Sequence, residues 1–232
     1  MRKCMVIGHR GASSEAPENT MKSFRRAWEI GCDMIELDVQ ETSDGHIVCI
    51  HDYDVSSTTS GGGMVAELSL KEIHSLDAGE GERVPLLTDV LDFAKANLGV
   101  DIELKTFDME SRILDMVRER DMLDKVMFSS FFHGTLQEII RLESEAFTAV
   151  LLNRELENPV EYTLELDAKA INPEFKMIDA DFVDSAHKAA LKVYPWTVND
   201  EDLMKDLLKM NVDGIITDIP ALAIHQISKY SS

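Results

Sequence analysis

The strongest chemical signal in the sequence comes from two tripeptides in which a leucine separates two charged residues. Glu36 and Asp38 flank the first leucine, and Glu103 and Lys105 flank the second. Residues two apart in a strand point to the same side, so Glu36 and Asp38 would share a face, where a cation between them would relieve their repulsion and lost hydration. With Glu103 as a third oxygen donor, the set suits one divalent metal, Mg²⁺ or Ca²⁺, rather than Zn²⁺. The alternative is that the acids only form ion pairs, with Arg10 and Lys105.

Two histidines, His9 and His51, each follow an apolar run, which would place their side chains at the mouth of a site. Histidine titrates nearest to neutral pH, so the two could serve as general acid and general base. Asp52 follows His51, but adjacent side chains in an extended segment point apart, so no His–Asp pair is predicted there. The other histidines fall on predicted turns or helices and are interpreted as structural: His46, His74, His133, His187 and His225.

Arg10 and Lys105 can supply positive charge to an anionic, phosphate-type group, Arg10 as a planar fork and Lys105 as a point charge. Glu18 and Asn19 could mark only the start of a helix, although Glu18 could also brace the far side of Arg10. Trp196 is either a core aromatic or a stacking wall for a substrate. Together these groups would form an active site for chemistry at a phosphate: a metal ion, a guanidinium, an ammonium and two imidazoles.

Short β-branched runs alternate along the chain with longer segments of helical periodicity, which predicts a parallel sheet. Eight such units favour an α/β fold of the (β/α)₈ TIM-barrel type, with an open doubly wound sheet as the alternative. The predicted strands are 4–8, 33–40 with 47–51 appended as a hairpin, 100–105, 126–129, 148–152, 169–171, 192–195 and 214–217. The predicted helices are 20–30, 87–96, 108–120, 134–143, 159–166, 180–189, 200–210 and one that closes the chain.

Two segments have more specific predictions. The helix at 20–30 should begin at an N-cap, Asn19, and bury a face made of Met21, Phe24 and Trp28. Residues 53–80 are rich in Ser, Thr and Gly and predict a short insertion after the second strand region, with a short helix near 70–76.

In a barrel of this type, functional residues sit at the carboxyl ends of the strands. The unusual polar and aromatic residues do fall there: His9, Arg10, Glu36, Asp38, His51, Glu103, Lys105, Ser129, Trp196 and Asp218. The predicted fold therefore brings the candidate residues to one face.

Composition narrows the class of protein. The chain has 232 residues, 44% of them hydrophobic, which suffices for one domain over 1–232 with a sizeable core. Its net charge of −20 argues against nucleic acid or an anionic membrane surface as a partner, so an anionic substrate would need local cations. Three cysteines without metal-type spacing indicate buried thiols and a reducing, cytoplasmic location. The start of the sequence shows no signal peptide, and no run is long enough for integral membrane contact; an oligomeric state is not indicated.

The motifs, taken together and in order, resemble those of the glycerophosphodiester phosphodiesterases across nearly the whole chain. They are His9-Arg10-Gly11, Pro17-Glu18-Asn19-Thr20, Glu36-x-Asp38, His51-Asp52, Glu103-x-Lys105, Trp196-Thr197-Val198-Asn199 and Gly214-Ile215-Ile216-Thr217-Asp218-x-Pro220.

The resemblance implies a (β/α)₈ barrel that hydrolyses glycerophosphodiesters, such as glycerophosphocholine, to sn-glycerol 3-phosphate and an alcohol. It implies these roles: divalent-metal ligands at Glu36, Asp38 and Glu103, acid/base catalysis by His9 and His51, phosphate binding by Arg10 and Lys105, and Trp196 on the glycerol side. The 53–80 insertion is short beside family members that carry a large cap there, which implies an open pocket and a loose choice of alcohol.

Two other classes stay open at this stage. One is a different metal-dependent barrel enzyme acting on a phosphorylated or enolisable substrate, which would release no alcohol from glycerophosphodiesters. The other is a non-catalytic phosphate-binding barrel, which the presence of both histidines and all three acids disfavours. The residues also leave open which histidine is acid and which is base, and whether water or a glycerol hydroxyl attacks first.

Overall fold

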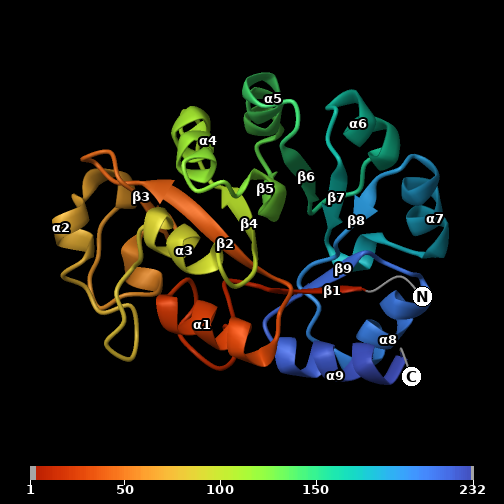
Figure 1. Ribbon diagram of the computed structural model, residues 1–232, viewed down its shortest axis with the longest axis horizontal. Coiled ribbons are helices and arrows are strands. Elements are labelled where there is room, and N and C mark those ends of the chain that lie inside the picture. The colour runs from red at the N-terminus through yellow and green to blue at the C-terminus, as the bar shows by residue number, and fades with distance from the viewer. Residues whose placement is uncertain (1–3, 231–232) are drawn as a thin grey trace.

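Parallel strands follow one another around a closed barrel, with helices outside it, in the computed structural model of the chain (Figure 1). The structure describes residues 4–230; residues 1–3, which belong to the segment searched for a signal peptide, lie outside that range. The strands are β1 (Met5–Gly8), β2 (Met34–Glu41), β3 (Ile47–Cys49), β4 (Gly99–Leu104), β5 (Val126–Ser130), β6 (Phe147–Leu152), β7 (Ala170–Pro173), β8 (Lys192–Val193) and β9 (Gly214–Thr217).

Most of the helices lie on the outside of this sheet and connect one strand to the next, and the last helix follows the last strand (Figure 1). They are α1 (Met21–Ile30), α2 (Leu70–Ile73), α3 (Leu87–Ala94), α4 (Glu110–Arg118), α5 (His133–Leu142), α6 (Pro159–Glu165), α7 (Ala180–Lys188), α8 (Glu201–Lys209) and α9 (Pro220–Tyr230).

The sheet closes on itself. The strand order is β8-β7-β6-β5-β4-β2-β1-β9, with β3 antiparallel to β2. Between β8 and β9, the amide of Asp213 donates to the carbonyl of Val193 and the amide of Ile216 donates to that of Pro195, each at 3.0 Å. The predicted (β/α)₈ barrel is therefore confirmed, and the open doubly wound alternative is wrong.

The alternation along β2 separates two environments. Ile35, Leu37 and Val39 are fully buried in the large apolar core that lies between the sheet and the helices. The residues between them point into the barrel. There a smaller apolar cluster fills the end near the strand starts: Ile7, Met34, Met127, Ala149, Ala170, Tyr194 and Ile216.

Helix α1 corrects one prediction in two details. Its N-cap is Thr20, whose side chain accepts from the amide of Ser23, and not Asn19. Its buried face is formed by Ser23, Phe24 and Ala27, whereas Trp28 is 46% exposed. The helix begins one residue later than predicted because Asn19 has a left-handed backbone (φ 53°) and turns its side chain toward the barrel.

The insertion at 53–80, which includes α2, lies beside β3 at the left of Figure 1. It contains two short 3₁₀ turns and the short helix α2, which spans less than the predicted 70–76 because only one turn follows its capping box of Ser69 and Glu72. A separate apolar cluster fastens it to the barrel: Val48, Ile50, Val55, Val65, Ile73, Ala78 and Val84. The insertion is thus packed at one side of the mouth.

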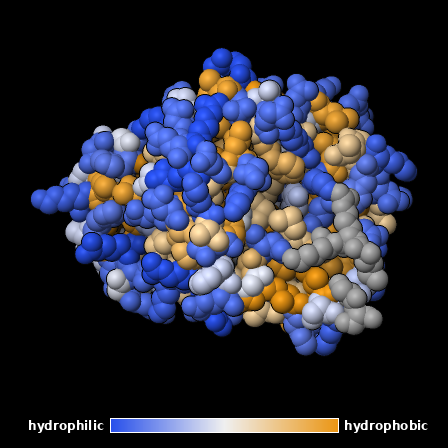
Figure 2. All heavy atoms as spheres, in the orientation of Figure 1, coloured by the Kyte–Doolittle hydropathy of each residue, from blue (hydrophilic) through white to orange (hydrophobic). Residues whose placement is uncertain are grey.

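Cys4, Cys32 and Cys49 are buried free thiols, as predicted. Burial raises the pKa of both Cys4 and Cys32 to about 12, so neither thiol ionises readily. Among residues 4–230, no helix has the length and apolar character needed to cross a membrane. Figure 2 shows a mostly hydrophilic face of the molecule, in keeping with the 28% of residues that are charged.

Candidate active site

Three carboxylates meet inside the barrel at the carboxyl ends of β2 and β4. The strand register places Asp38 beside Glu103 and Glu36 beside Asp101. One oxygen from each of Glu36, Asp38 and Glu103 lies within 4.8 Å of the others, and all three residues are buried. The predicted set therefore does come together.

Placing carboxyl groups together in a buried site raises the pKa values of Glu36, Glu103 and Asp101. Burial, and then the neighbouring charges of Asp38 and Glu103, raise the pKa of Glu36 well above its usual range. Burial and Asp38 raise the pKa of Glu103 to about 7. Burial raises that of Asp101 to about 8, although Ser129 donates a hydrogen bond to it. Without a compensating cation, these groups resist ionisation.

Two of the buried oxygens lack hydrogen bonds. Oε1 of Glu36 and Oδ1 of Asp38 accept none, which is unusual for buried carboxylates. Each oxygen therefore keeps the capacity to bind a cation, although Asp38 Oδ1 already lies 3.4 Å from the ammonium of Lys105. Oxygen-only donors of this kind fit a hard divalent ion such as Mg²⁺ or Ca²⁺. The three residues therefore fit a metal site.

Ion pairs are present as well, so the two interpretations of the acidic residues are not exclusive. The ammonium of Lys105 lies 3.0 Å from Glu103 Oε1 and 3.4 Å from Asp38 Oδ1. The guanidinium of Arg10 lies 3.4 Å from Asp38 Oδ2. These cations offset part of the repulsion, yet the carboxylate pKa values still remain high.

The loop after β1 is shaped to present Arg10. Its backbone is left-handed (φ 53°), and its amide donates to Glu36 Oε2 at 2.8 Å. Glu18 accepts from Arg10 Nη1 at 2.9 Å, which is the bracing role predicted for it. Asn19 donates to Asp38 Oδ2 at 2.9 Å. At Gly11 (φ 86°) a Cβ would collide with Ser23 of α1, so only glycine allows the loop to lie this close to the helix.

His9 is oriented by a residue to which the sequence assigned no role. Its Nδ1 lies 2.6 Å from Asp218 Oδ1, after β9, and its Nε2 lies 4.0 Å from Glu36 Oε2. Burial alone would raise the pKa of Asp218, but hydrogen bonds from His9, Asn199 and Ser13 outweigh it and lower the pKa to about 2. An anionic Asp218 accepts the Nδ1 proton, which leaves Nε2 of His9 facing the cavity. The position of Asp218 at the end of the last strand was the signal for this role.

His51 corrects the prediction that it would not pair with Asp52. Its Nδ1 lies 2.8 Å from Asp52 Oδ1, because the chain turns after β3 and does not continue as a strand. The side chain of Gln40 donates to the carbonyls of Ile50, His51 and Asp52 and holds this turn. Hydrogen bonds from Ser57 and from His51 lower the pKa of Asp52.

Trp196 closes the opposite, apolar side of the mouth. Its indole donates to the carbonyl of Asn172 at 2.8 Å, and its ring meets that of Phe131 edge to face at 5.5 Å between centroids. The cavity between the charged and apolar sides has a volume of about 60 Å³. It is lined by His9, Arg10, Glu36, His51, Asp101, Glu103, Ser129, Phe131, Leu151, Trp196 and Ile216.

Comparison with known proteins gives one consistent family. Residues 9–222 match the model of the glycerophosphoryl diester phosphodiesterase family. A glycerophosphodiester phosphodiesterase of Caldanaerobacter subterraneus subsp. tengcongensis is 37% identical over 240 residues, which cover 98% of this chain and 99% of that protein.

Solved structures agree with this match. A Silicibacter pomeroyi putative glycerophosphoryl diester phosphodiesterase superposes with a TM-score of 0.92 at 26% identity, over 99% of this chain and 94% of that one. An Oleispira antarctica phosphodiesterase, solved with its product sn-glycerol-3-phosphate, superposes with a TM-score of 0.91 at 28% identity, over 97% and 96% of the two chains.

Proposed function

This chain belongs to the glycerophosphodiester phosphodiesterase family, and we propose that it hydrolyses glycerophosphodiesters such as glycerophosphocholine to sn-glycerol 3-phosphate and an alcohol. The observation that carries the proposal is the cavity at the strand ends, which is lined by Glu36, Glu103, Arg10 and both imidazoles. Lys105 and Asp38 lie directly behind this lining, where the ammonium contacts both Glu103 and Asp38. The whole barrel acts as one catalytic domain, to which 53–80 adds part of the rim.

Glu36, Asp38 and Glu103 hold a divalent cation in this proposal. Their closeness, their burial and the two oxygens without hydrogen bonds support it. The ion, Mg²⁺ or Ca²⁺, would supply positive charge next to the phosphodiester. Its binding would also remove the cost of keeping three ionised carboxylates in one buried site.

Arg10 and Lys105 bind the phosphate in this proposal. Both carry their charge beside the carboxylate cluster, and Glu18 keeps the guanidinium of Arg10 oriented. When a diester anion lies against Arg10 and Lys105, the two cations would replace part of their contacts with the acids by contacts with the phosphate oxygens. Trp196, held by its hydrogen bond to Asn172, would form the wall on the glycerol side.

His9 and His51 serve as the acid and the base. Each has Nδ1 bound to an aspartate, so each presents Nε2 as the nitrogen that exchanges a proton. One imidazole would take a proton from the attacking oxygen as the P–O bond forms. The other would give a proton to the oxygen of the departing alcohol as its P–O bond breaks.

Release of sn-glycerol 3-phosphate from glycerophosphocholine tests the activity. The purified chain is assayed with Mg²⁺ or Ca²⁺ and with excess chelator, and we expect product only with metal. Absence of product with either metal would favour a different metal-dependent barrel enzyme or a phosphate-binding barrel. Binding of glycerol 3-phosphate without turnover would single out the latter.

The glycerol should matter more than the alcohol, because the charged cluster and Trp196 surround one end of the substrate. Glycerophosphocholine, glycerophosphoethanolamine and glycerophosphoglycerol should have kcat/KM values within about tenfold, or about 1.4 kcal/mol. An analogue without the free glycerol hydroxyls should be worse by about 10²-fold, because polar groups in the cavity lose their partners. Equal turnover of that analogue would make the enzyme a general phosphodiesterase.

A further inference from the structure

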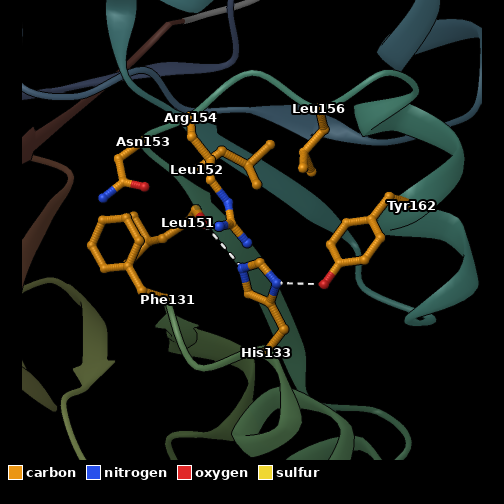
Figure 3. Close-up of a pocket in the computed structure, with 8 residues that line it drawn as sticks. All are labelled: Phe131, His133, Leu151, Leu152, Asn153, Arg154, Leu156 and Tyr162. Atoms are coloured by element: carbon orange, nitrogen blue, oxygen red, sulfur yellow. Dashed lines mark hydrogen bonds between the residues drawn. The ribbon is translucent and has the colours of Figure 1, made fainter.

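A second cavity adjoins the catalytic one at the carboxyl ends of β5 and β6. Its volume is about 220 Å³, and it shares two lining residues, Phe131 and Leu151, with the catalytic cavity. Figure 3 shows its other lining residues: His133, Leu152, Asn153, Arg154, Leu156 and Tyr162. We infer that this cavity binds an anionic group, a carboxylate or a phosphate, carried by the departing alcohol, and that Arg154 determines this specificity.

The inference rests on the proposed function and extends it to the alcohol. Phe131 and Leu151 line both cavities, so the cavities adjoin at these two side chains, and the ring of Phe131 contacts that of Trp196. A substrate whose glycerol lies beside Trp196 can therefore extend past Phe131 into the second cavity. A space of this size suits a small alcohol and not a bulky one.

The floor of the second cavity is preformed by His133 at the start of α5. Its Nε2 lies 3.0 Å from the carbonyl oxygen of Leu151, and its Nδ1 lies 2.7 Å from the hydroxyl of Tyr162 on α6 (Figure 3). A carbonyl only accepts, so Nε2 carries the proton and Nδ1 accepts from Tyr162. Both nitrogens are thus occupied, and His133 shapes the cavity and is not the group that binds the ligand.

Arg154 is the group left to bind it. Within residues 4–230 its guanidinium forms no ion pair or hydrogen bond, although Glu155 and Glu157 are close in the sequence. Figure 3 shows the guanidinium reaching from the loop after β6 across the cavity toward the ring of His133. Arg154 is exposed on the wall of a cavity that adjoins the catalytic one, so its charge is available to a ligand there.

The rest of the lining fits a short polar alcohol. Leu152, Leu156 and Phe131 offer apolar contact for its carbon atoms, and Asn153 offers an amide. A guanidinium can bind a carboxylate or phosphate through two parallel hydrogen bonds, which an ammonium or a single hydroxyl group on the alcohol cannot accept.

A matched pair of substrates tests the inference. Glycerophosphoserine differs from glycerophosphoethanolamine by one carboxylate on the alcohol. With saturating metal we expect kcat/KM to be about tenfold higher for glycerophosphoserine, the scale of one hydrogen-bonded charge pair at a partly exposed site. Arg154→Gln should bring the two values together by lowering only the glycerophosphoserine value, and Arg154→Lys should retain part of the preference.

Arg25→Gln is the matched control, because Arg25 is an exposed arginine on α1 outside both cavities. It should keep the wild-type preference. Equal kcat/KM values in the wild type, or a preference that survives Arg154→Gln, would overturn the inference while leaving the proposed function intact. A higher value for glycerophosphoethanolamine would mean that the alcohol site prefers a cation. If neither substrate is hydrolysed, the proposed function itself fails.

Discussion

Along β2, Met34 lies in an apolar layer inside the barrel, whereas Glu36 and Asp38, nearer the carboxyl end, lie among charged groups. The two layers occupy the same barrel, and both are buried. The apolar layer stabilises the fold through the area it removes from water. The charged layer costs stability, since burial and mutual repulsion raise the pKa values of Glu36 and Glu103. Stability and chemistry are thus assigned to different ends of the same strands.

The largest expected effect is on the charged layer. Chelation of divalent ions should reduce kcat by about 10³-fold, the several kcal/mol that a metal contributes at a phosphate, and added Mg²⁺ or Ca²⁺ should restore it. Glu36→Gln should weaken metal binding measured by titration calorimetry. It should also raise the melting temperature of the metal-free protein, because it removes a buried carboxyl group that is costly to ionise.

Glu67→Gln, at an exposed position in the insertion, is the control and should leave both measurements unchanged. Full activity in excess chelator, or wild-type metal affinity in Glu36→Gln, would contradict the assignment of metal binding to the charged layer.

The histidines come next. His9→Ala and His51→Ala should each lower kcat by about 10²-fold or more, the scale of a lost general acid or base. The melting temperature should hardly change, because both side chains face the cavity and not the apolar layer. His225→Ala, on the exposed side of α9, should keep full activity. A variant that unfolds while its folded fraction turns over normally would identify that histidine as structural.

The apolar layer should show the opposite pattern. Met127 is 2% exposed, and Met127→Ala should lower the free energy of unfolding by about 2–5 kcal/mol through lost burial and the cavity left behind. Denaturant titration measures this cost, and kcat of the folded fraction should change little. A large loss of kcat without loss of stability would show that the two layers are not independent.

The smallest effect expected is a pH dependence of stability in the metal-free protein. The folded-state pKa values of Glu103, about 7, and Asp101, about 8, lie above ordinary carboxyl values. The folded protein therefore binds more protons than the unfolded chain, and this contribution to stability is lost as pH rises from about 4 through 8. Melting temperatures in chelator should fall by several degrees between pH 5.5 and 8.5. Excess divalent ion should reduce that fall, and a melting temperature that rises over this range would contradict the assignment.

The sequence was most informative where a local pattern has one spatial consequence. The alternation of strands and helices predicted the barrel, and the E-x-D spacing of Glu36 and Asp38 predicted a shared face. Because parallel strands present their carboxyl ends at one edge, the approach of Glu103 to this pair followed from the fold.

Details that depend on tertiary contacts were harder to predict. Asn19 is a residue type that often caps helices, but its side chain donates a hydrogen bond to Asp38 instead. Thr20 is therefore the N-cap of α1. The pairing of His51 with Asp52 depends on a turn held by Gln40, which lies on another strand. Asp218 is far from His9 in the sequence, and only closure of the barrel brings them together.

The three buried thiols allow transient local opening of the barrel to be measured by thiol labelling, without adding a probe. Cys4 and Cys32 lie just before β1 and β2, and Cys49 ends β3, so each thiol reports on a different segment of the barrel. A thiol reagent labels a cysteine only when that segment opens, and the rate divided by the rate of a free thiol gives a local opening equilibrium. Cys49 lies in the main core, on the opposite side of β3 from Val48 and Ile50, and would report opening of β3. Cys4, next to β1, would report separation of β1 from β9. Because β3 leads directly into His51 of the catalytic cavity, a substrate or metal that holds His51 in place would slow labelling at Cys49 before it slows labelling at Cys4.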